Sequence, residues 1–381
     1  MRLAALLCAC ALLLAGCGRS FVGHADPMPS SPALRVATYN ASLYSDEAGG
    51  LLRRLEAGDA DARKVAAVLQ RVRPDVVLVN EFDFDPSGRT ADAFQRAYLE
   101  VPQPGGGAAL RYPYRYLAPV NTGVPSGLDL DRSGHVATAV SGEDAHAARQ
   151  RGNDAWGYGL HPGQYGMLLL SMHPIDTGSA RSFQLLRWSA LPGAARPTDP
   201  ATGAWWYGDE VWAQLRLSSK SHWDVPVRTS LGVVHMLASH PTPPVFDGPE
   251  DRNGARNHDE IRLWHEYISD DGRERPWLCD DAGRCGGLPA DARFVILGDL
   301  NNDPADGDGR HEAIVELLEH PRVLRMPTPR SAGAAYASGA DRPGRRGDVA
   351  HATGDFGPRT GPLRLDYVLP SSGFRLHDAG V

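Results

Sequence analysis

The feature that most constrains the fold is a series of short apolar segments, each of which ends at polar residues. The segments are shorter than typical helices and are rich in Val, Ile, Leu and aromatic residues, which favours β-strands. Functional residues often gather at strand ends and on the loops beyond them. We therefore expect the polar groups that follow these segments to meet at one edge of a sheet stack. The candidate strands cover residues 34–39, 76–79, 167–171, 211–217, 225–238, 294–297 and 364–369.

Helices are expected to be few, because the chain holds 42 glycines and 30 prolines. Residues 61–73 have one apolar face and end before Pro74, which predicts a helix. A second helix is predicted over residues 312–319. Residues 101–165 are rich in Gly, Pro and Asp, which is typical of a long excursion over the surface.

The segments 211–217 and 225–238 predict a pair of antiparallel strands. The polar stretch Lys220–Asp224 between them is expected to form the turn. Lys220, His222 and Trp223 could contact a substrate from that turn or could simply be exposed on it.

The N-terminus predicts export. Arg2 precedes an apolar stretch, Leu3–Ala15, that is too short to span a membrane. The following residues, Leu14–Cys17, resemble a bacterial lipobox, which implies a lipid anchor on Cys17. An ordinary secretory signal is the alternative. We expect anchoring to the outer membrane or cell surface, or otherwise a periplasmic or secreted protein. The expected signal peptide, tether and single folded domain cover residues 1–17, 18–33 and 34–381.

Two cysteines remain beyond the signal, Cys279 and Cys285, and both lie in a polar loop. In an oxidising compartment such a pair is expected to form a disulfide. A zinc site is the weaker alternative, because this part of the chain offers no further cysteine to complete one.

The formal net charge is −7. Proteins that grip nucleic acid usually carry a basic footprint. The acidic balance therefore disfavours tight binding to a nucleic acid, although a local basic groove is compatible with it.

Six polar residues follow or interrupt the predicted strands in the same manner. Their carboxylate and carbonyl oxygens suit a hard divalent cation, which usually keeps several waters. A histidine beside such an ion can contact a phosphoryl oxygen or move a proton. These residues are Asn40, Glu81, His240, Asp299, Asn301 and Asp366.

The order of these motifs resembles the endonuclease/exonuclease/phosphatase superfamily, which includes deoxyribonucleases, neutral sphingomyelinases and inositol-phosphate phosphatases. The resemblance runs from residue 34 to residue 370. It implies an α/β (α+β) fold, a four-layer αββα sandwich with two mixed, mostly antiparallel sheets flanked by helices. The matching motifs are Thr38–Asn40, Asn80–Glu81, Tyr165–Gly166, Ser239–His240, Gly298–Asn301 and Leu365–Leu369.

The resemblance also implies a role for each matched residue. Glu81 would bind the metal, usually Mg²⁺ and alternatively Mn²⁺, with Asn40 beside it. Asp299 would orient or deprotonate the attacking water. Asn301 would bind the phosphoryl oxygens, and His240 would stabilise the charge that develops on them.

Two further positions complete this comparison. Tyr165 would hydrogen-bond the phosphate, and Asp366 would orient a second histidine. In the family that histidine belongs to a Ser-Asp-His element after one more strand, and the residues up to Val381 do not contain it. We expect either a missing C-terminal strand or a site that has lost part of its machinery.

Three more residues are candidates for substrate binding. Arg187 stands next to Trp188, which is as well explained by packing. Arg256 and His258 follow the rigid loop after His240. A solvated helix start at residue 259, with Asn257 as its cap, explains them equally well. The segment Trp205–Tyr207 is compatible with an aromatic rim or a packed flap.

The expected protein is a monomeric, Mg²⁺-dependent hydrolase of phosphate esters, either a phosphodiesterase or a phosphomonoesterase. The charge and the membrane tether favour a small molecule or a lipid headgroup as the substrate over nucleic acid. Two alternatives stay open at this point. One is a metal-dependent nuclease, and the other is a catalytically impaired surface lipoprotein that binds a phosphorylated ligand.

Overall fold

The computed structural model describes residues 32–138, 144–337, 339–341 and 343–381. Residues Leu34–Val381 form one compact unit. The expected signal peptide, most of the tether and Cys17 lie outside the described residues. Within the described ranges, no helix combines the length and the apolar character needed to cross a membrane.

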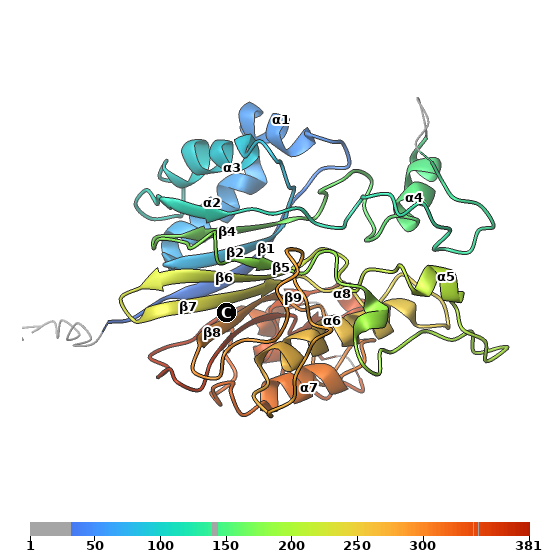
Figure 1. Ribbon diagram of the computed structural model, residues 1–381. Helices are drawn as coiled ribbons and strands as arrows, with labels where there is room; N and C mark the ends of the chain where they lie inside the picture. The colour runs from blue at the N-terminus through green and yellow to red at the C-terminus, as the bar shows by residue number, and fades with distance from the viewer. Residues whose placement is uncertain (1–31, 139–143, 338, 342) are drawn as a thin grey trace, which may run out of the picture. The chain divides into compact units, whose positions relative to one another are not determined.

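Two sheets form the centre of this unit (Figure 1). The first has the strand order β1-β2-β4-β3 and the second has the order β11-β8-β7-β6-β5. The pairs β1/β2 and β7/β8 are parallel, and the other pairs in these two sheets are antiparallel. The first sheet consists of β1 (Val36–Leu43), β2 (Val76–Phe82), β3 (Tyr114–Tyr116) and β4 (Met167–Ser171). The second consists of β5 (Arg181–Ser182), β6 (His222–Thr229), β7 (Gly232–Ser239), β8 (Arg293–Asp299) and β11 (Asp366–Pro370).

Helices cover the outer face of each sheet (Figure 1). One apolar cluster joins the first sheet to α1 (Gly50–Ala57), α2 (Ala60–Val72) and α3 (Arg89–Phe94). Another joins the second sheet to α6 (Arg252–Ile268) and α7 (Glu312–Glu319). The molecule is therefore the expected four-layer αββα sandwich, and the predicted helices at residues 61–73 and 312–319 are confirmed within a residue.

The remaining elements are short. They lie in the loops around the two sheets, and α4 belongs to the long excursion between β3 and β4. They are the π-helical turn Gln95–Leu99, α4 (Ala145–Asn153), α5 (Asp209–Trp212), α8 (Gly357–Thr360), the 3₁₀ turns Trp188–Ala190, Gly333–Tyr336 and Val349–His351, and the two-stranded pair β9 (Gly354–Asp355) and β10 (Pro362–Leu363).

The layer between the sheets fixes the direction of the site residues. Side chains alternate along a strand, so every second residue of a strand faces this layer. The apolar members that fill it are joined in one cluster. Those in the strands that lead to the site are Val36, Val76, Leu78, Val234, Met236, Ala238, Val295, Leu297 and Val368.

The predicted antiparallel pair of strands over residues 211–217 and 225–238 is wrong. Residues 225–238 are divided between the two strands of a hairpin, β6 and β7. Val211 ends up in the short helix α5, and the hairpin partner of β7 is β6, which pairs through Thr229 with Gly232. The apolar residues Leu215 and Leu217 are buried in the cluster that joins the second sheet to α6 and α7, here called the helix-side core. Their backbone bonds lead to the segment at residues 186–188 instead of to a sheet. The segment Lys220–Asp224, where the turn was expected, is consequently buried. From His222 onward it belongs to strand β6.

The start of α6 also differs from the prediction. The helix begins at Arg252, with Asp251 at its N-cap position, so Asn257 lies inside it. The Asn257 amide is fully buried and donates to the carbonyls of Thr242 and Leu300. Asn257 therefore ties the helix to two loops near the ends of β7 and β8, and it does not cap the helix.

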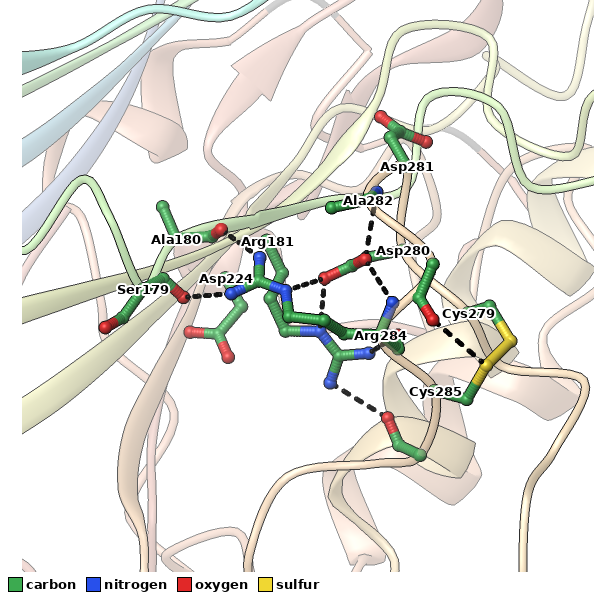
Figure 2. Close-up of polar contacts among 12 residues, drawn as sticks. Ser179, Ala180, Arg181, Asp224, Cys279, Asp280, Asp281, Ala282, Arg284 and Cys285 are labelled. Atoms are coloured by element: carbon green, nitrogen blue, oxygen red, sulfur yellow. Dashed lines mark hydrogen bonds and ion pairs between the residues drawn. A yellow bond between two sulfur atoms is a disulfide. The ribbon is translucent and has the colours of Figure 1, made fainter.

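A disulfide joins Cys279 to Cys285 (Figure 2). Inside the loop that it closes, the buried carboxylate of Asp280 accepts hydrogen bonds from Arg181 Nε at 3.0 Å and from Arg284 Nε at 2.7 Å. Arg181 belongs to β5, the edge strand of the second sheet. The disulfide loop is thus fastened to the sheet edge by an ion-pair network.

Candidate functional site

The alternation in the strands directs five polar side chains into the layer between the sheets. Each lies an even number of positions from an apolar residue of that layer, at the end where β1, β2, β7 and β8 finish. β11 runs antiparallel to β8, and its first residue lies opposite the last residue of β8. The five residues are Asn40, Asn80, His240, Asp299 and Asp366.

Asn40 links the two sheets. Its Nδ2 donates to Glu81 Oε1 at 3.0 Å and to Asp299 Oδ2 at 2.9 Å. The pairing of β1 with β2 becomes irregular between Asn40 and Leu43. Such bulges re-aim side chains and are frequent beside active sites. The two carboxylates therefore converge on one point, which the Asn40 amide occupies.

Three of the expected site residues have a left-handed backbone. The φ angles are 56° at Glu81, 56° at Tyr165 and 53° at Asn301. This region costs a residue with a side chain roughly 1–3 kcal/mol and is concentrated at functional sites. For Glu81 the consequence is direct. Regular alternation would turn its side chain away from the layer that holds Asn80, and the left-handed turn instead lets it meet Asn40.

Asp299 is held on both of its oxygens. Its Oδ1 accepts the backbone N–H of Asn301 at 2.9 Å, and its Oδ2 accepts Asn40. Burial raises the pKa of Asp299 to about 6, the negative charge of Glu81 adds to this, and the bonds from Asn40 and Asn301 oppose it. The backbone N–H of Asp299 also donates to Asn80 Oδ1 at 3.2 Å.

His240 lies beside Asp299. The distance from its Nε2 to Asp299 Oδ2 is 3.7 Å, which is longer than a hydrogen bond. Its Nδ1 is buried and has no partner among the described residues. Burial, and then the positive charge of Lys220, hold the pKa of His240 well below its ordinary value. His240 is therefore neutral at physiological pH and offers one N–H as a donor.

Asp366 faces Asp299 across the β11/β8 pair. Burial, and then the charge of Asp299, raise the pKa of Asp366 to about 8. Its Oδ1 is buried and has no hydrogen-bond partner within the described chain. Its backbone N–H donates to Thr353 Oγ1 at 3.0 Å.

This donor set fits a hard divalent cation. Glu81 and Asp299 point their carboxylates at one position, and a third carboxylate, Asp366, has an unpaired buried oxygen nearby. Burial is the main cause of the raised pKa values of Asp299 and Asp366, and the negative charges of neighbouring acids add to it. A cation would relieve that repulsion. Oxygen ligands of this kind are those that Mg²⁺ prefers.

Tyr165 lies against the same end of the first sheet. Its ring centroid is 4.5 Å from that of Tyr44, and its backbone N–H donates to Asp83 Oδ1 at 3.2 Å. Burial raises the pKa of the Tyr165 hydroxyl, and the charge of Glu81 contributes in the same direction. The hydroxyl thus stays protonated and can donate a hydrogen bond.

The other substrate-binding candidates lie elsewhere in the contact network. Arg256 donates from Nε and Nη2 to the backbone carbonyls of Leu217, Arg216 and Trp156, so its guanidinium holds loops together. His258 Nδ1 lies 3.0 Å from the buried carboxylate of Asp259. The side chain of Arg187 is exposed.

Two further residues lie at the site. The sequence predicts no role of its own for Asn80, and it leaves Lys220 open as either a substrate contact or an exposed turn residue. Asn80 is fully buried and joins the sheets, because its Oδ1 accepts the N–H of Asp299 and its Nδ2 lies 3.4 Å from the carbonyl of Ser239. Lys220 is buried next to the turn that follows His240. The alternation beyond Leu78 contains the signal for Asn80. The burial of Lys220 beside Pro241 depends on the register of β6 and β7, which was not predicted from the sequence.

A second group of acids lies outside this constellation, in the excursion that carries α4. Carboxylate oxygens of Asp129, Asp131 and Asp154 lie within 4.8 Å of one another. Their oxygens accept backbone N–H groups of their own loop, including those of Leu130 and Ser133.

The solved structures that are similar to this chain include the following three. A sphingomyelinase C from Streptomyces griseocarneus is 19% identical, with 91% of this chain and 86% of that chain covered and a TM-score of 0.45. An endonuclease/exonuclease/phosphatase from Beutenbergia cavernae is 17% identical, with 88% and 64% covered and a TM-score of 0.43. A beta-toxin mutant from Staphylococcus aureus with bound magnesium ions is 14% identical, with 91% and 86% covered and a TM-score of 0.41.

No curated protein matches the chain. The family model described as "Endonuclease/Exonuclease/phosphatase family" matches residues 37–381, which is nearly all of the folded unit. Members of this family are generally metal-dependent hydrolases of phosphate esters. The chain therefore belongs to the endonuclease/exonuclease/phosphatase family.

Proposed function

We propose that this protein hydrolyses a phosphate ester with the help of Mg²⁺, and that Glu81, Asp299 and His240 carry out the reaction. One observation supports the assignment most strongly. The Asn40 amide contacts both Glu81 and Asp299, which brings two carboxylates from different sheets to one point beside His240. The family supports the reaction class, and this geometry is compatible with the roles that the resemblance implies.

Glu81 and Asn40 would hold the metal. A bound Mg²⁺, or alternatively Mn²⁺, would neutralise negative charge on the phosphoryl group. The left-handed backbone keeps the Glu81 carboxylate beside Asn40, so this ligand is positioned before a cation arrives. For Asn40, the amide oxygen is the group that could coordinate a cation, and rotation about its terminal bond exchanges it with Nδ2.

Asp299 would orient the attacking water and accept its proton. Asn301 fixes one carboxylate oxygen through its backbone N–H, which leaves the other oxygen facing Asn40 and His240. A carboxylate set in this way can direct a water molecule toward phosphorus, on the side away from the leaving group. Hydrolysis would then proceed without a covalent enzyme intermediate.

His240 and Asn301 would stabilise the phosphoryl oxygens as negative charge builds on them. A neutral histidine does this with its N–H, and donors fixed in a buried site are more effective than the same groups in water. The Asn301 amide is held in place by a 3.0 Å bond to the carbonyl of Pro241. The hydroxyl of Tyr165 is a further donor for the phosphate, and Asp366 would support the histidine side of the site.

The substrate is proposed to be a small phosphorylated molecule or a lipid headgroup. The net charge of −7 supports this choice over a nucleic acid. An export signal and a lipid anchor at Cys17 remain predictions from the sequence, and they would put the enzyme at a membrane surface. A second function is binding of a phosphorylated ligand without efficient turnover. It is supported by the buried Oδ1 of Asp366, which has no hydrogen-bond partner among the described residues.

Turnover measurements with defined substrates test the proposal. The mature protein is assayed with p-nitrophenyl phosphate, bis-p-nitrophenyl phosphate, phospholipid vesicles and DNA, with Mg²⁺ or with EDTA. We expect metal-dependent turnover that Glu81→Gln and His240→Gln each lower by at least about 100-fold. Glu316→Gln and His377→Gln change exposed residues and serve as matched controls. Binding of inorganic phosphate without turnover of any ester would favour the second function.

A further inference from the structure

The register of strands β6 and β7 places Lys220 next to the turn formed by His240 and Pro241. His222 pairs with Ser239 in the β6/β7 ladder. Continuing the antiparallel pairing by two residues places Lys220 opposite Pro241, the residue after His240. Lys220 Nζ indeed lies 3.4 Å from the carbonyl oxygen of Pro241, which also accepts the Asn301 amide at 3.0 Å.

The Lys220 ammonium has N–H groups without an acceptor among the described residues. The side chain is buried, with 5% of the residue exposed. An ammonium carries three N–H donors, and a bond of 3.4 Å is at the long limit for one of them. Pro241 supplies its only hydrogen-bond acceptor among the described residues. A buried charge with so few partners is costly unless a ligand completes its hydrogen bonds.

The charges around Lys220 belong to the site. Burial lowers the pKa of Lys220, and the negative charges of Glu260, Glu81 and Asp299 oppose this shift. The positive charge of Arg256 adds to it. Lys220 also acts on His240, whose pKa its positive charge lowers further after burial. Its contact with Pro241, the residue after His240, and these charge interactions put the ammonium near the proposed site.

Glu260 fixes the backbone on both sides of this lysine and the histidine. Its Oε1 accepts the backbone N–H of Ser219 at 2.7 Å, and its Oε2 accepts that of Thr242 at 2.6 Å. These two residues flank Lys220 and the His240–Pro241 turn, respectively. The fully buried Glu260 therefore holds together the segment before β6 and the segment after β7. Its negative charge also balances the charge of Lys220.

The composition adds an independent argument. Of the 39 lysines and arginines in the chain only two are lysines, Lys64 and Lys220. Lys64 is exposed on α2 and pairs with Asp61. A chain that otherwise uses arginine retains a lysine in the buried site. Lysine offers there a compact ammonium on a flexible stem, whereas arginine would offer a planar guanidinium.

We propose that Lys220 is a further substrate-binding residue, whose ammonium contacts the anionic phosphoryl oxygens of the substrate, and that Glu260 positions it. This inference rests on the proposed function and deepens it. Because attraction scales with charge, Lys220 favours a dianionic phosphomonoester over a monoanionic phosphodiester. The residue thus contributes to the choice of substrate class as well as to binding.

Variants of the full mature chain test the role of the charge. Lys220→Met keeps the length of the side chain and removes the ammonium, and Lys64→Met is the matched control. With Mg²⁺ present, we expect Lys220→Met to bind inorganic phosphate about 10- to 100-fold more weakly in titration calorimetry. Its kcat/KM should fall more for p-nitrophenyl phosphate than for bis-p-nitrophenyl phosphate. Lys220→Arg should restore part of the phosphate affinity.

A second measurement needs no change at Lys220. Protein labelled with ¹³C at lysine Cε gives two lysine signals, and Lys64→Met assigns them. Addition of inorganic phosphate to the Mg²⁺-loaded protein should shift the Lys220 signal and leave that of Lys64 unchanged.

The outcomes separate this inference from the proposed function. A wild type that turns over phosphate esters, together with an unshifted Lys220 signal and unchanged phosphate affinity in Lys220→Met, would overturn the role of Lys220 alone. A wild type that binds phosphate through Lys220 without turnover would support the inference and contradict catalysis. A wild type that neither binds phosphate nor hydrolyses any ester overturns both.

Discussion

Asn40 and Asp299 lie 259 positions apart in the sequence, yet Asn40 Nδ2 donates a 2.9 Å hydrogen bond to Asp299 Oδ2. The bond joins the first strand of one sheet to a central strand of the other, and the same amide reaches Glu81. In the absence of a cation, this amide balances two carboxylates that would otherwise repel each other. The contact would therefore couple the stability of the sheet interface to occupation of the proposed metal site.

This coupling predicts the behaviour of Asn40→Asp. The new carboxylate would face Glu81 and Asp299, so the free energy of unfolding in EDTA should fall by about 1–3 kcal/mol. Mg²⁺ should recover most of that loss, because a cation attracts all three groups. Urea unfolding with and without Mg²⁺ measures both effects. Asn40→Ala removes the amide without adding charge and should show a weaker dependence on Mg²⁺; an equal dependence in the two variants would contradict the coupling.

The stability of the metal-free protein should depend on the protonation of Asp366. A pKa raised to about 8 means that the folded protein holds a proton which the unfolded chain releases. Stability therefore falls as the pH rises toward this value. Below the ordinary histidine pKa of 6.5, His240 and His222 act in the opposite direction, because their pKa values are lowered in the fold. The informative window runs from 6.5 to 8.

Urea unfolding in EDTA across this window checks the prediction. The free energy of unfolding should decrease with pH, by at most about 1.4 kcal/mol per pH unit for one group. Asp366→Asn should flatten the slope. Stability that rises through the window in the wild type would show that Asp366 is ionised throughout.

The layered fold could be predicted because most of its strands are short runs of apolar residues that the chain encodes locally. The positions of Asn40, His240 and Asp299 follow from the same runs, since each continues the alternation of a buried strand. Their convergence was inferred from the family resemblance and from strand ends, and the structure now places Asn40 in contact with Asp299.

Other parts of the site depend on long-range contacts, which local sequence does not encode. The segment 211–217 alternates like a strand, but Leu215 and Leu217 bury their side chains in the helix-side core and bond to residues 186–188. That error moved the expected turn onto Lys220 and hid its place beside Pro241. The left-handed backbone of Glu81 was equally invisible, because only the contact with Asn40 explains it.

The network around Asp280 should be important for stability (Figure 2). The Asp280 side chain is fully buried and accepts from Arg181 and Arg284. Asp280→Asn would leave two guanidinium groups without their carboxylate, and we expect a loss of roughly 2–4 kcal/mol in the free energy of unfolding. Asp61→Asn removes an exposed ion pair with Lys64 and should leave the midpoint unchanged. Equal effects in the two variants would show that burial of the pair is irrelevant.

The backbone of Glu81 offers a test that separates strain from metal binding. Its φ of 56° suits glycine and strains any residue with a Cβ. Glu81→Gly and Glu81→Ala both remove the proposed ligand, so both should lose Mg²⁺-dependent activity. Urea unfolding in EDTA should nevertheless find the glycine variant more stable than the alanine variant by about 1 kcal/mol, because only alanine keeps the strain. The reverse order would mean that the loop relaxes once the carboxylate is gone, and that the bond from Asn40 to Glu81 is what holds the left-handed turn in place.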